Sequence, residues 1–421
     1  MAAPRHRWVV FGGLVGVYFS FGVAVAAIAP MLSLVRDDLG ASRGQMGLAL
    51  GAWALVYIVT APLAGRFIDR FDLGWSLALG GGSVVGSLLL RASAHGIGTL
   101  WLAVAFFGVF GPLISASAPT LMANWFPDDR ERRRGVGLYA AAPALGGTIT
   151  VAVTNPVLLA WFGSWRSVLV FEAAIGAAFT AAWLVIWTTV ERPERHATDD
   201  EPAAAGSLGR LIGSVEIRLI LVMAFAVFFV NHALGTWMPT VLEEFGGYSP
   251  TAAGAWVAVA GVLAIAATAV LPGHATPERM HRMIATLLLV SGVAIAVIAV
   301  APAAVMGPAA IVTSVRSALV PLAIVTLLES DRVTPANTGF ANGLWFSVAE
   351  IGGVTGPLTL GAIADSGLGY EGALTVVATV ALATAGLALL QQRVHSAAAT
   401  GREDQSPSGT GVVTNSTNRA R

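Results

Sequence analysis

Residues 8–34 read WVVFGGLVGVYFSFGVAVAAIAPMLSL, and this stretch decides the fold. It carries no charged residue and exceeds the about 20 residues that an α-helix needs to cross the hydrocarbon core of a bilayer. It follows Arg5 and Arg7, but it is too long for the apolar region of a signal peptide, which has about 7–15 residues. We therefore expect a first membrane-spanning helix, not a cleaved leader.

Eleven further stretches of similar length and polarity follow. With the first, they predict an all-α integral membrane protein of twelve transmembrane helices. The spans are expected at 8–34, 45–65, 74–94, 98–124, 135–160, 166–188, 217–242, 250–272, 283–301, 304–329, 338–361 and 372–391.

Composition supports a chain whose main solvent is lipid. Apolar residues make up 56% of the 421 residues, charged residues 11%, and the mean hydropathy is +0.74. A soluble protein carries about 25% charged residues. The chain has no cysteine and no lysine, which excludes disulfides, cysteine metal sites and a P-loop ATPase. We predict no metal and no cofactor, and the zero net charge gives no reason to expect nucleic acid.

The longest internal connection divides the chain. We expect a six-helix bundle over residues 1–188, a cytoplasmic linker over 189–216, and a second six-helix bundle over 217–392. Residues 393–421 are rich in polar and small residues and are expected to form a disordered cytoplasmic tail.

Arginine placement predicts the orientation. With the N-terminus in the cytoplasm, 19 arginines fall in cytoplasmic segments, 4 in outer segments, and one, Arg316, inside a span. The positive-inside rule then places both termini in the cytoplasm of a multi-pass protein of the cell membrane.

A weak internal repeat indicates two pseudo-symmetric bundles. The end of the first span, Ala29-Pro30-Met31 and then Asp37-Asp38, matches the end of the seventh, Met238-Pro239-Thr240 and then Glu243-Glu244. Ala144-Leu145-Gly146-Gly147 of the fifth span matches Glu350-Ile351-Gly352-Gly353 of the eleventh. Transporters built from repeated halves hold their solute near the midplane, between the halves.

Loop motifs resemble the major facilitator superfamily over about residues 8–392. Gly65-Arg66-Phe67-Ile68-Asp69-Arg70 fits the motif between the second and third helices, although Asp72 stands where glycine is expected. Asn124-Trp125-Phe126-Pro127 and Gly163-Ser164-Trp165-Arg166 are similar to two further junctions. The Trp-Phe-Pro junction and Gly352-Gly353-Val354-Thr355-Gly356-Pro357 look most like bacterial anion carriers of the monocarboxylate, oxalate/formate and nitrate or cyanate groups. The resemblance implies a cytoplasmic gate made by Asp69, Arg70, Arg132, Arg133 and Arg134.

Arg316 and Glu350 are the charges expected deepest in the membrane. An ionisable residue at this depth is expensive and commonly functional, and a guanidinium suits a carboxylate or an oxyanion. The resemblance places the tenth helix at the central cavity. We expect Arg316 to bind substrate and Glu350 to carry a coupling proton, with the two residues within reach of each other; a permanent structural ion pair is the alternative.

Other polar residues at mid-span are candidate substrate contacts. Asn231 and His232 lie in the seventh span, Tyr18 in the first and Tyr57 in the second. Each can also be a packing or interface residue. Glu172, nearer the outer end, is interpreted as the structural partner of Arg91.

These features predict a secondary active transporter that works by alternating access. We expect a monomer that takes up a small organic or inorganic anion with protons. The alternative is efflux of drugs or amphipathic metabolites by proton antiport. An intramembrane enzyme is a more distant alternative, because the buried ionisable residues are few and scattered; the protein is expected not to be an enzyme.

Overall fold

The structure is a computed structural model that describes residues 6–191 and 207–403, and this part of the chain is helical without strands. Within it, twelve helical segments are long and apolar enough to cross a membrane, from Arg7–Asp38 to Gly369–Gln391. The predicted all-α fold with twelve spans is confirmed.

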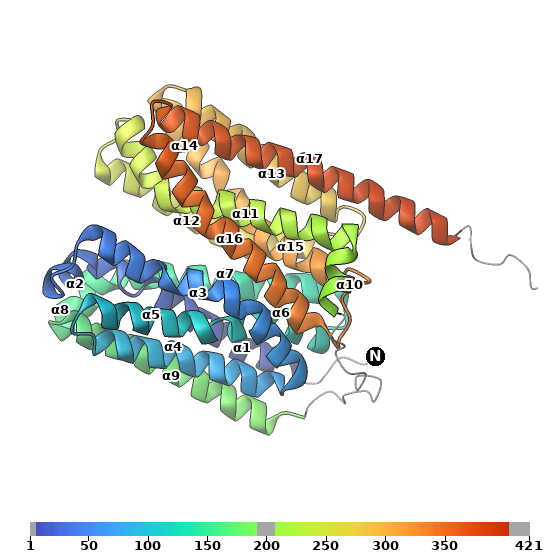
Figure 1. Cartoon of the computed structure of the whole chain (residues 1–421), viewed down its shortest axis with the longest axis horizontal. Helices are drawn as coiled ribbons and strands as arrows, with labels where there is room; N and C mark the ends of the chain where they lie inside the picture. The colour runs from blue at the N-terminus through green and yellow to red at the C-terminus, as the bar shows by residue number, and fades with distance from the viewer. Residues whose placement is uncertain (1–5, 192–206, 404–421) are drawn as a thin grey trace, which may run out of the picture.

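The first six spans form one bundle, which lies in the lower half of Figure 1. Three of them are interrupted near Pro30, Pro112 and Pro156, because proline has no backbone N–H to donate. The elements are α1 (Arg7–Ala26), η1 (Ala29–Met31), α2 (Leu32–Asp38), α3 (Arg43–Arg70), α4 (Leu73–Ala92), α5 (Ile97–Phe110), α6 (Pro112–Trp125), α7 (Asp129–Val153), η2 (Thr154–Leu158), α8 (Leu159–Phe162) and α9 (Trp165–Thr189).

The last six spans form the second bundle, which is preceded by the short α10 (Ser207–Gly213). Its elements are α11 (Val215–Thr240), η4 (Val241–Phe245), α12 (Pro250–Val270), η5 (Leu271–His274), α13 (Met280–Val300), α14 (Ala303–Thr313), η6 (Ser314–Ala318), α15 (Leu319–Leu328), α16 (Thr338–Ala364) and α17 (Gly369–Glu403).

Two segments that were predicted to connect or follow the bundles contain helix in the structure. The predicted linker, 189–216, includes the helix α10, and its residues 192–206 lie outside the described part of the chain. The predicted disordered tail is wrong over 393–403, because α17 continues to Glu403. Ala397, Ala398 and Ala399 favour this extension, since alanine is the strongest helix former. Residues 404–421 lie outside the described residues.

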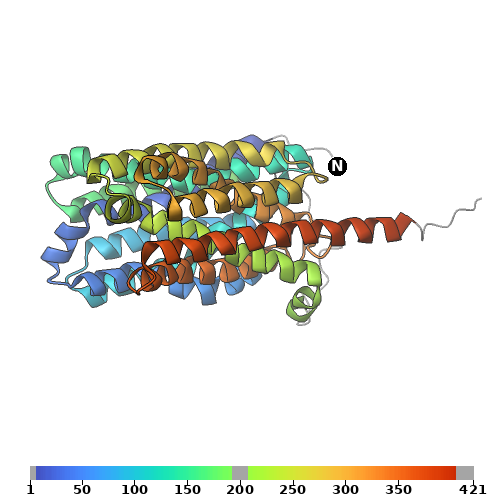
Figure 2. The ribbon, with the colours of Figure 1, turned by 90° about the horizontal axis from the view of Figure 1, so that it is seen from above.

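The spans run side by side along the long axis of the molecule (Figures 1 and 2). The N-terminus and α10 lie at one end, which we call the linker end; it carries the loops 71–72, 126–128, 275–279 and 329–337. The opposite end, which we call the far end, carries the loops 39–42, 93–96, 163–164, 246–249, 301–302 and 365–368.

Glycines make the same close helix crossing in both halves. Where α1 crosses α7, a Cβ on Gly146 would overlap the carbonyl of Phe19. Where α11 crosses α16, a Cβ on Gly352 would overlap the carbonyl of Phe225. Close backbone approach at small residues is how helices pack in lipid. The matched crossings support two pseudo-symmetric halves.

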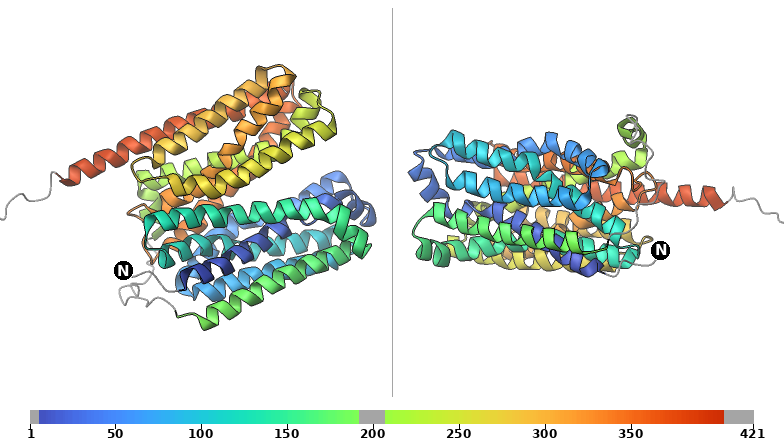
Figure 3. Two further views of the ribbon diagram at one scale, coloured as in Figure 1. Left: turned by 180° about the vertical axis from the view of Figure 1, so that it is seen from behind. Right: turned by 90° about the horizontal axis from the view of Figure 1, so that it is seen from below.

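The largest contacts between the halves are those of α3 with α16 and of α7 with α12, and α6 and α7 also contact α16 and α15, respectively (Figure 3). Near the linker end, a Cβ on Gly65 would overlap the carbonyl of Gly339, and one on Gly343 would overlap that of Ala61. In the other pair, a Cβ on Gly137 would lie 2.8 Å from the carbonyl of Thr268. The backbones of the two halves therefore touch in the part of these helices nearer the linker end.

Candidate functional site

Arg316 lies in a break within the tenth span. The α-helix stops at Thr313, continues as the 3-10 turn η6, and resumes as α15 at Leu319. Pro321 accounts for the break, because it has no N–H to bond the carbonyl four residues earlier. Discontinuous helices at mid-membrane are a recurrent feature of solute sites.

The guanidinium of Arg316 has no acidic partner. Its Nη1 donates to the carbonyl of Thr313 at 3.0 Å and to the Thr313 hydroxyl at 3.2 Å, while its buried Nε has no partner. No described carboxylate lies within 4.0 Å of it. The expected pairing with Glu350 is thus not formed in this structure. Arg316 is half-buried, and η6 packs against α11 and α12.

Glu350 is buried on α16 and faces His232 of α11 across Gly353. A side chain at Gly353 would begin 3.1 Å from Glu350 Oε2 and 3.4 Å from both Cε1 and Nδ1 of His232. Glu350 is 5% exposed and forms no ion pair within the described residues. The glycine leaves free the space that these two side chains share.

Asn231 and His232 hold their positions through their own helix. Asn231 Nδ2 donates to the carbonyl of Val227 at 2.9 Å, and His232 Nδ1 lies 3.0 Å from the carbonyl of Phe228. The imidazole stacks on the Phe228 ring. The turn η6, which carries Arg316, packs against α11, which carries His232. The structure therefore brings Arg316, His232 and Glu350 into one region of the C-terminal half.

Tyr18 and Tyr57 belong to the N-terminal half and are joined through Ser115. The Tyr57 and Ser115 hydroxyls are hydrogen-bonded, and the Tyr18 hydroxyl donates to the Ser115 carbonyl at 3.4 Å. Both tyrosines are buried. Tyr57 contacts the ring of Phe346 on α16, so it lies where the halves meet.

A series of neighbouring aromatic side chains includes these two tyrosines and continues into both halves. Centroids of successive rings lie 5.1–6.5 Å apart, a spacing typical of favourable aromatic pairs. We call this series the aromatic belt; its members in order are Tyr139, Tyr18, Phe21, Trp53, Tyr57, Phe346, Phe228 and His232.

The expected gate lies at the linker end, and Asp69 is its centre. The Asp69 carboxylate accepts from the backbone N–H groups of Gly339 and Phe340, at 2.7 and 2.8 Å. These amides belong to the first turn of α16, so a carboxylate of the N-terminal half caps a helix of the C-terminal half. Arg66, which sequence reasoning missed, lies over the Phe340 ring at 4.5 Å.

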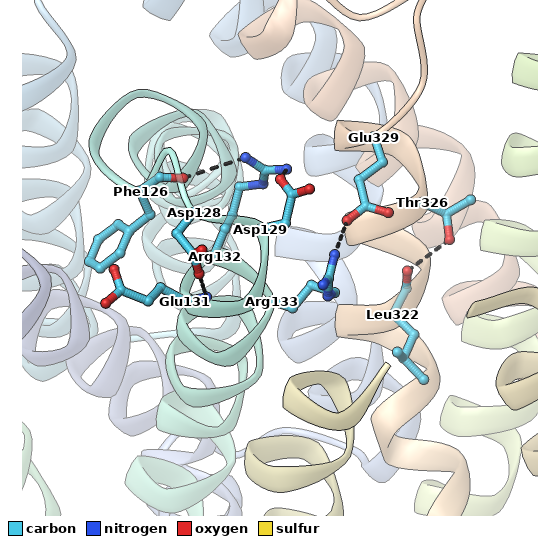
Figure 4. A network of polar contacts seen from close by, with 9 residues as sticks. All are labelled: Phe126, Asp128, Asp129, Glu131, Arg132, Arg133, Leu322, Thr326 and Glu329. Carbon is cyan, nitrogen blue, oxygen red and sulfur yellow. Dashed lines mark hydrogen bonds and ion pairs between the residues drawn. The ribbon is translucent and has the colours of Figure 1, made fainter. Parts of the chain in front are cut away.

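The basic residues expected at the gate divide into two groups (Figure 4). Arg133 reaches the other half and pairs with Glu329 at 2.8 Å. Arg132 turns back to Asp129 and to the carbonyl of Phe126 within its own half. Glu329 was not anticipated, because nothing in the sequence relates it to a residue 196 positions away.

The two remaining gate residues, Arg134 and Arg70, also lie at the linker end. The side chain of Arg134 lies against Gly273 of the other half, and Arg70 ends α3 at the same end of the molecule.

The predicted pair of Glu172 with Arg91 is not formed as an ion pair. Arg91 instead donates to the carbonyl of Ala24 at 2.6 Å, and both buried oxygens of Glu172 lack a hydrogen-bond partner.

The described chain is thus a multi-pass membrane protein of two like bundles, with Arg316 and Glu350 inside spans of the second bundle. Residues 14–333 match the Major Facilitator Superfamily, and the chain belongs to this family of transporters. It is therefore a transporter and not an enzyme.

Relatives and solved structures agree with this assignment. The chain is 26% identical to a probable nitrate/nitrite transporter of Mycobacterium tuberculosis, over 88% of this chain and 91% of that protein. It is 26% identical to a putative tartrate transporter of Agrobacterium vitis, over 85% and 87%. Its fold is similar to that of the Escherichia coli fucose:proton symporter, with a TM-score of 0.75 and 15% identity over 92% of this chain and 99% of that one.

Proposed function

We propose that this protein is a secondary carrier of the cell membrane that takes up a small anion together with protons, by alternating access between the two halves. The observation that carries the proposal is the half-buried Arg316, which lies in a helix break and has no carboxylate partner within residues 6–191 and 207–403. An unpaired guanidinium at this depth is costly, and a bound anion would relieve that cost.

The relatives favour the same kind of substrate. Nitrate/nitrite and tartrate, named for two relatives, are both anions. These observations favour anion transport over efflux of cationic or amphipathic compounds.

Glu350 is the proposed proton carrier. It is buried, has no ion pair among the described residues, and shares a space with His232 beside Gly353. In the proposed cycle, a proton on Glu350 and an anion on Arg316 cross together, so the buried site is closer to neutral during the conformational change.

With the termini in the cytoplasm, as the arginine distribution favours, the linker end faces the cytoplasm. The Asp69 cap and the Arg133–Glu329 pair then close the cytoplasmic side. We assign the structure to an outward-facing state of a monomer in which these contacts must break before the substrate is released.

The test is proton movement in proteoliposomes with a pH-sensitive dye inside. Small carboxylates (acetate, benzoate and tartrate), nitrate and cyanate are added outside to wild type, Arg316→Ala and a control, Arg36→Ala, whose guanidinium pairs with Asp37 at the exposed far end. We expect inward proton movement with at least one anion for wild type and Arg36→Ala, and none above protein-free vesicles for Arg316→Ala. Movement that survives in Arg316→Ala would contradict the anion site, and transport of amphipathic cations alone would support efflux.

A further inference from the structure

The polar groups around Arg316 are suited to a ligand with one charge. Of the described arginines, Arg316 is the one in the central part of a span, while the buried Arg91 is the last residue but one of α4, at the far end, and donates to the carbonyl of Ala24. One guanidinium balances one negative charge, so a dianion would leave a charge unpaired at mid-depth.

Few hydroxyls of the spans are free to bind a hydroxylated ligand. Thr60 donates to Gly108 across a helix contact, Ser347 donates to Ile58, and Thr313, beside Arg316, donates to Ala310. The Tyr139 hydroxyl of the belt has no partner among the described residues. A polyhydroxylated acid requires several free donors and acceptors, because a buried hydroxyl without a partner is penalised, so these contacts favour a ligand with few hydroxyls.

The aromatic belt supplies an apolar wall instead. It passes from the N-terminal half to the C-terminal half through the contact of Tyr57 with Phe346, and it ends in His232 stacked on Phe228. His232, Trp53 and Phe21 are half-buried, so parts of the belt retain accessible surface. Phe228 and His232 lie on α11, against which the turn η6 that carries Arg316 packs, so this end of the wall and the cation lie on adjacent elements.

We propose that the site selects monocarboxylates with a planar, ring-bearing body. The carboxylate binds Arg316, and the ring rests against the belt where His232 stacks on Phe228. This inference rests on the proposed function, since it names the substrate class of the same site. Inorganic oxyanions have no body for the belt to contact, and hydroxy-diacids and sugar acids match neither the single charge nor the apolar wall.

The test is equilibrium binding by calorimetry to the purified full chain, which avoids the passive membrane permeation of weak acids. The probes are benzoate, acetate, nitrate and tartrate. We expect benzoate to bind at least about tenfold more tightly than each of the other three, because ring stacking and burial add to the charge interaction. Arg316→Ala should abolish binding of benzoate.

Substitutions in the aromatic belt distinguish direct contact between the belt and the ring of the ligand from a general effect on protein packing. We expect Phe228→Leu to weaken benzoate binding about tenfold and acetate binding less than twofold. Trp53→Leu, in the other half, provides a second belt variant if Phe228→Leu does not yield folded protein. The matched control is Phe106→Leu, whose ring pairs with Phe110 outside the belt and should leave the benzoate-to-acetate ratio unchanged.

Each result separates this inference from the proposed function. Arg316-dependent binding in which nitrate or tartrate exceeds benzoate would overturn the ring-bearing substrate and leave the anion carrier standing. Equal losses for benzoate and acetate in both belt variants would also overturn it. Failure of every anion to bind, or binding that survives in Arg316→Ala, would overturn the proposed anion site and this inference with it.

Discussion

At the residue scale, Arg316 and Glu350 are two buried or half-buried charges that have no counter-ion among the described residues. Arg316 is satisfied in part by Thr313, while Glu350 forms no ion pair among the described residues. A structural ion pair at mid-depth would hold both residues permanently. Two separated charges instead leave each free for a transported ion, which is the property that the proposed mechanism requires.

Glu350→Gln tests this separation. Because the substitution removes a buried carboxylate that has no ion-pair partner, we expect the thermal midpoint of the purified protein to stay within about 2 °C of wild type or to rise. Proton movement should be lost in the same variant.

Glu329→Gln is the matched control, because it breaks the Arg133–Glu329 pair, and it should lower the midpoint. A fall of the midpoint in Glu350→Gln as large as that in the control would show that Glu350 is a structural partner, and unchanged proton coupling would remove its transport role.

In the sequence, Arg316 and Glu350 could be recognised only by their position inside apolar spans. Charged residues inside apolar spans are visible in any hydropathy reading, so Arg316 and Glu350 were recognised as deep. The two residues form no ion pair in this structure, and hydropathy could not decide this, because the direction of a side chain depends on the local backbone. The 3-10 turn that changes the helical repeat at Arg316 has one sequence signal, Pro321, which was not interpreted as a break.

At the element scale, the cap of α16 joins the two halves. The Asp69 carboxylate belongs to α3, but the amides that it accepts from belong to the first turn of α16. Most helix caps come from a residue adjacent in sequence, as Asp128 caps α7. The loop motif identified Asp69 as a gate residue. Its partner could not be identified, because the contact spans 270 positions and depends on the packing of the halves.

Asp69→Asn should weaken closure at the linker end. Asparagine can still cap the helix, but loss of the negative charge at its N-terminus costs about 0.3–1 kcal/mol, which corresponds to a population shift of about 2- to 5-fold toward the open linker end. Since the chain has no native cysteine, the measurement is the alkylation rate of Ser347→Cys, a position buried between the halves, and the variant should react faster.

Asp128→Asn is the control, because it removes a cap within one half. It should leave the alkylation rate of Ser347→Cys unchanged. Equal acceleration by both substitutions would mean that Asp69 acts on helix stability alone and does not hold the halves together.

At the scale of the whole molecule, duplication explains both the fold and the position of the site. The twelve spans follow directly from hydropathy, and the internal repeat anticipated the matched glycine crossings at Gly146 and Gly352. The aromatic belt was not anticipated, because its members are scattered over five helices and join only after the halves pack. Only Tyr18, Tyr57 and His232 among them had been recognised, as polar residues at mid-span.

The central claim is that an anion occupies a site beside Arg316 between the halves, and protection of a single cysteine tests it most directly. Thr236 is exposed one turn beyond His232 on α11, so a thiol reagent can report on ligand there. The alkylation rate of Thr236→Cys would be measured with and without saturating anion, alone and combined with Arg316→Ala, with the exposed Thr375→Cys on α17 as the control. We predict that the anion slows alkylation at least about threefold at position 236, only when Arg316 is present and not at position 375. Unchanged labelling at position 236, or equal protection without Arg316, would contradict the account.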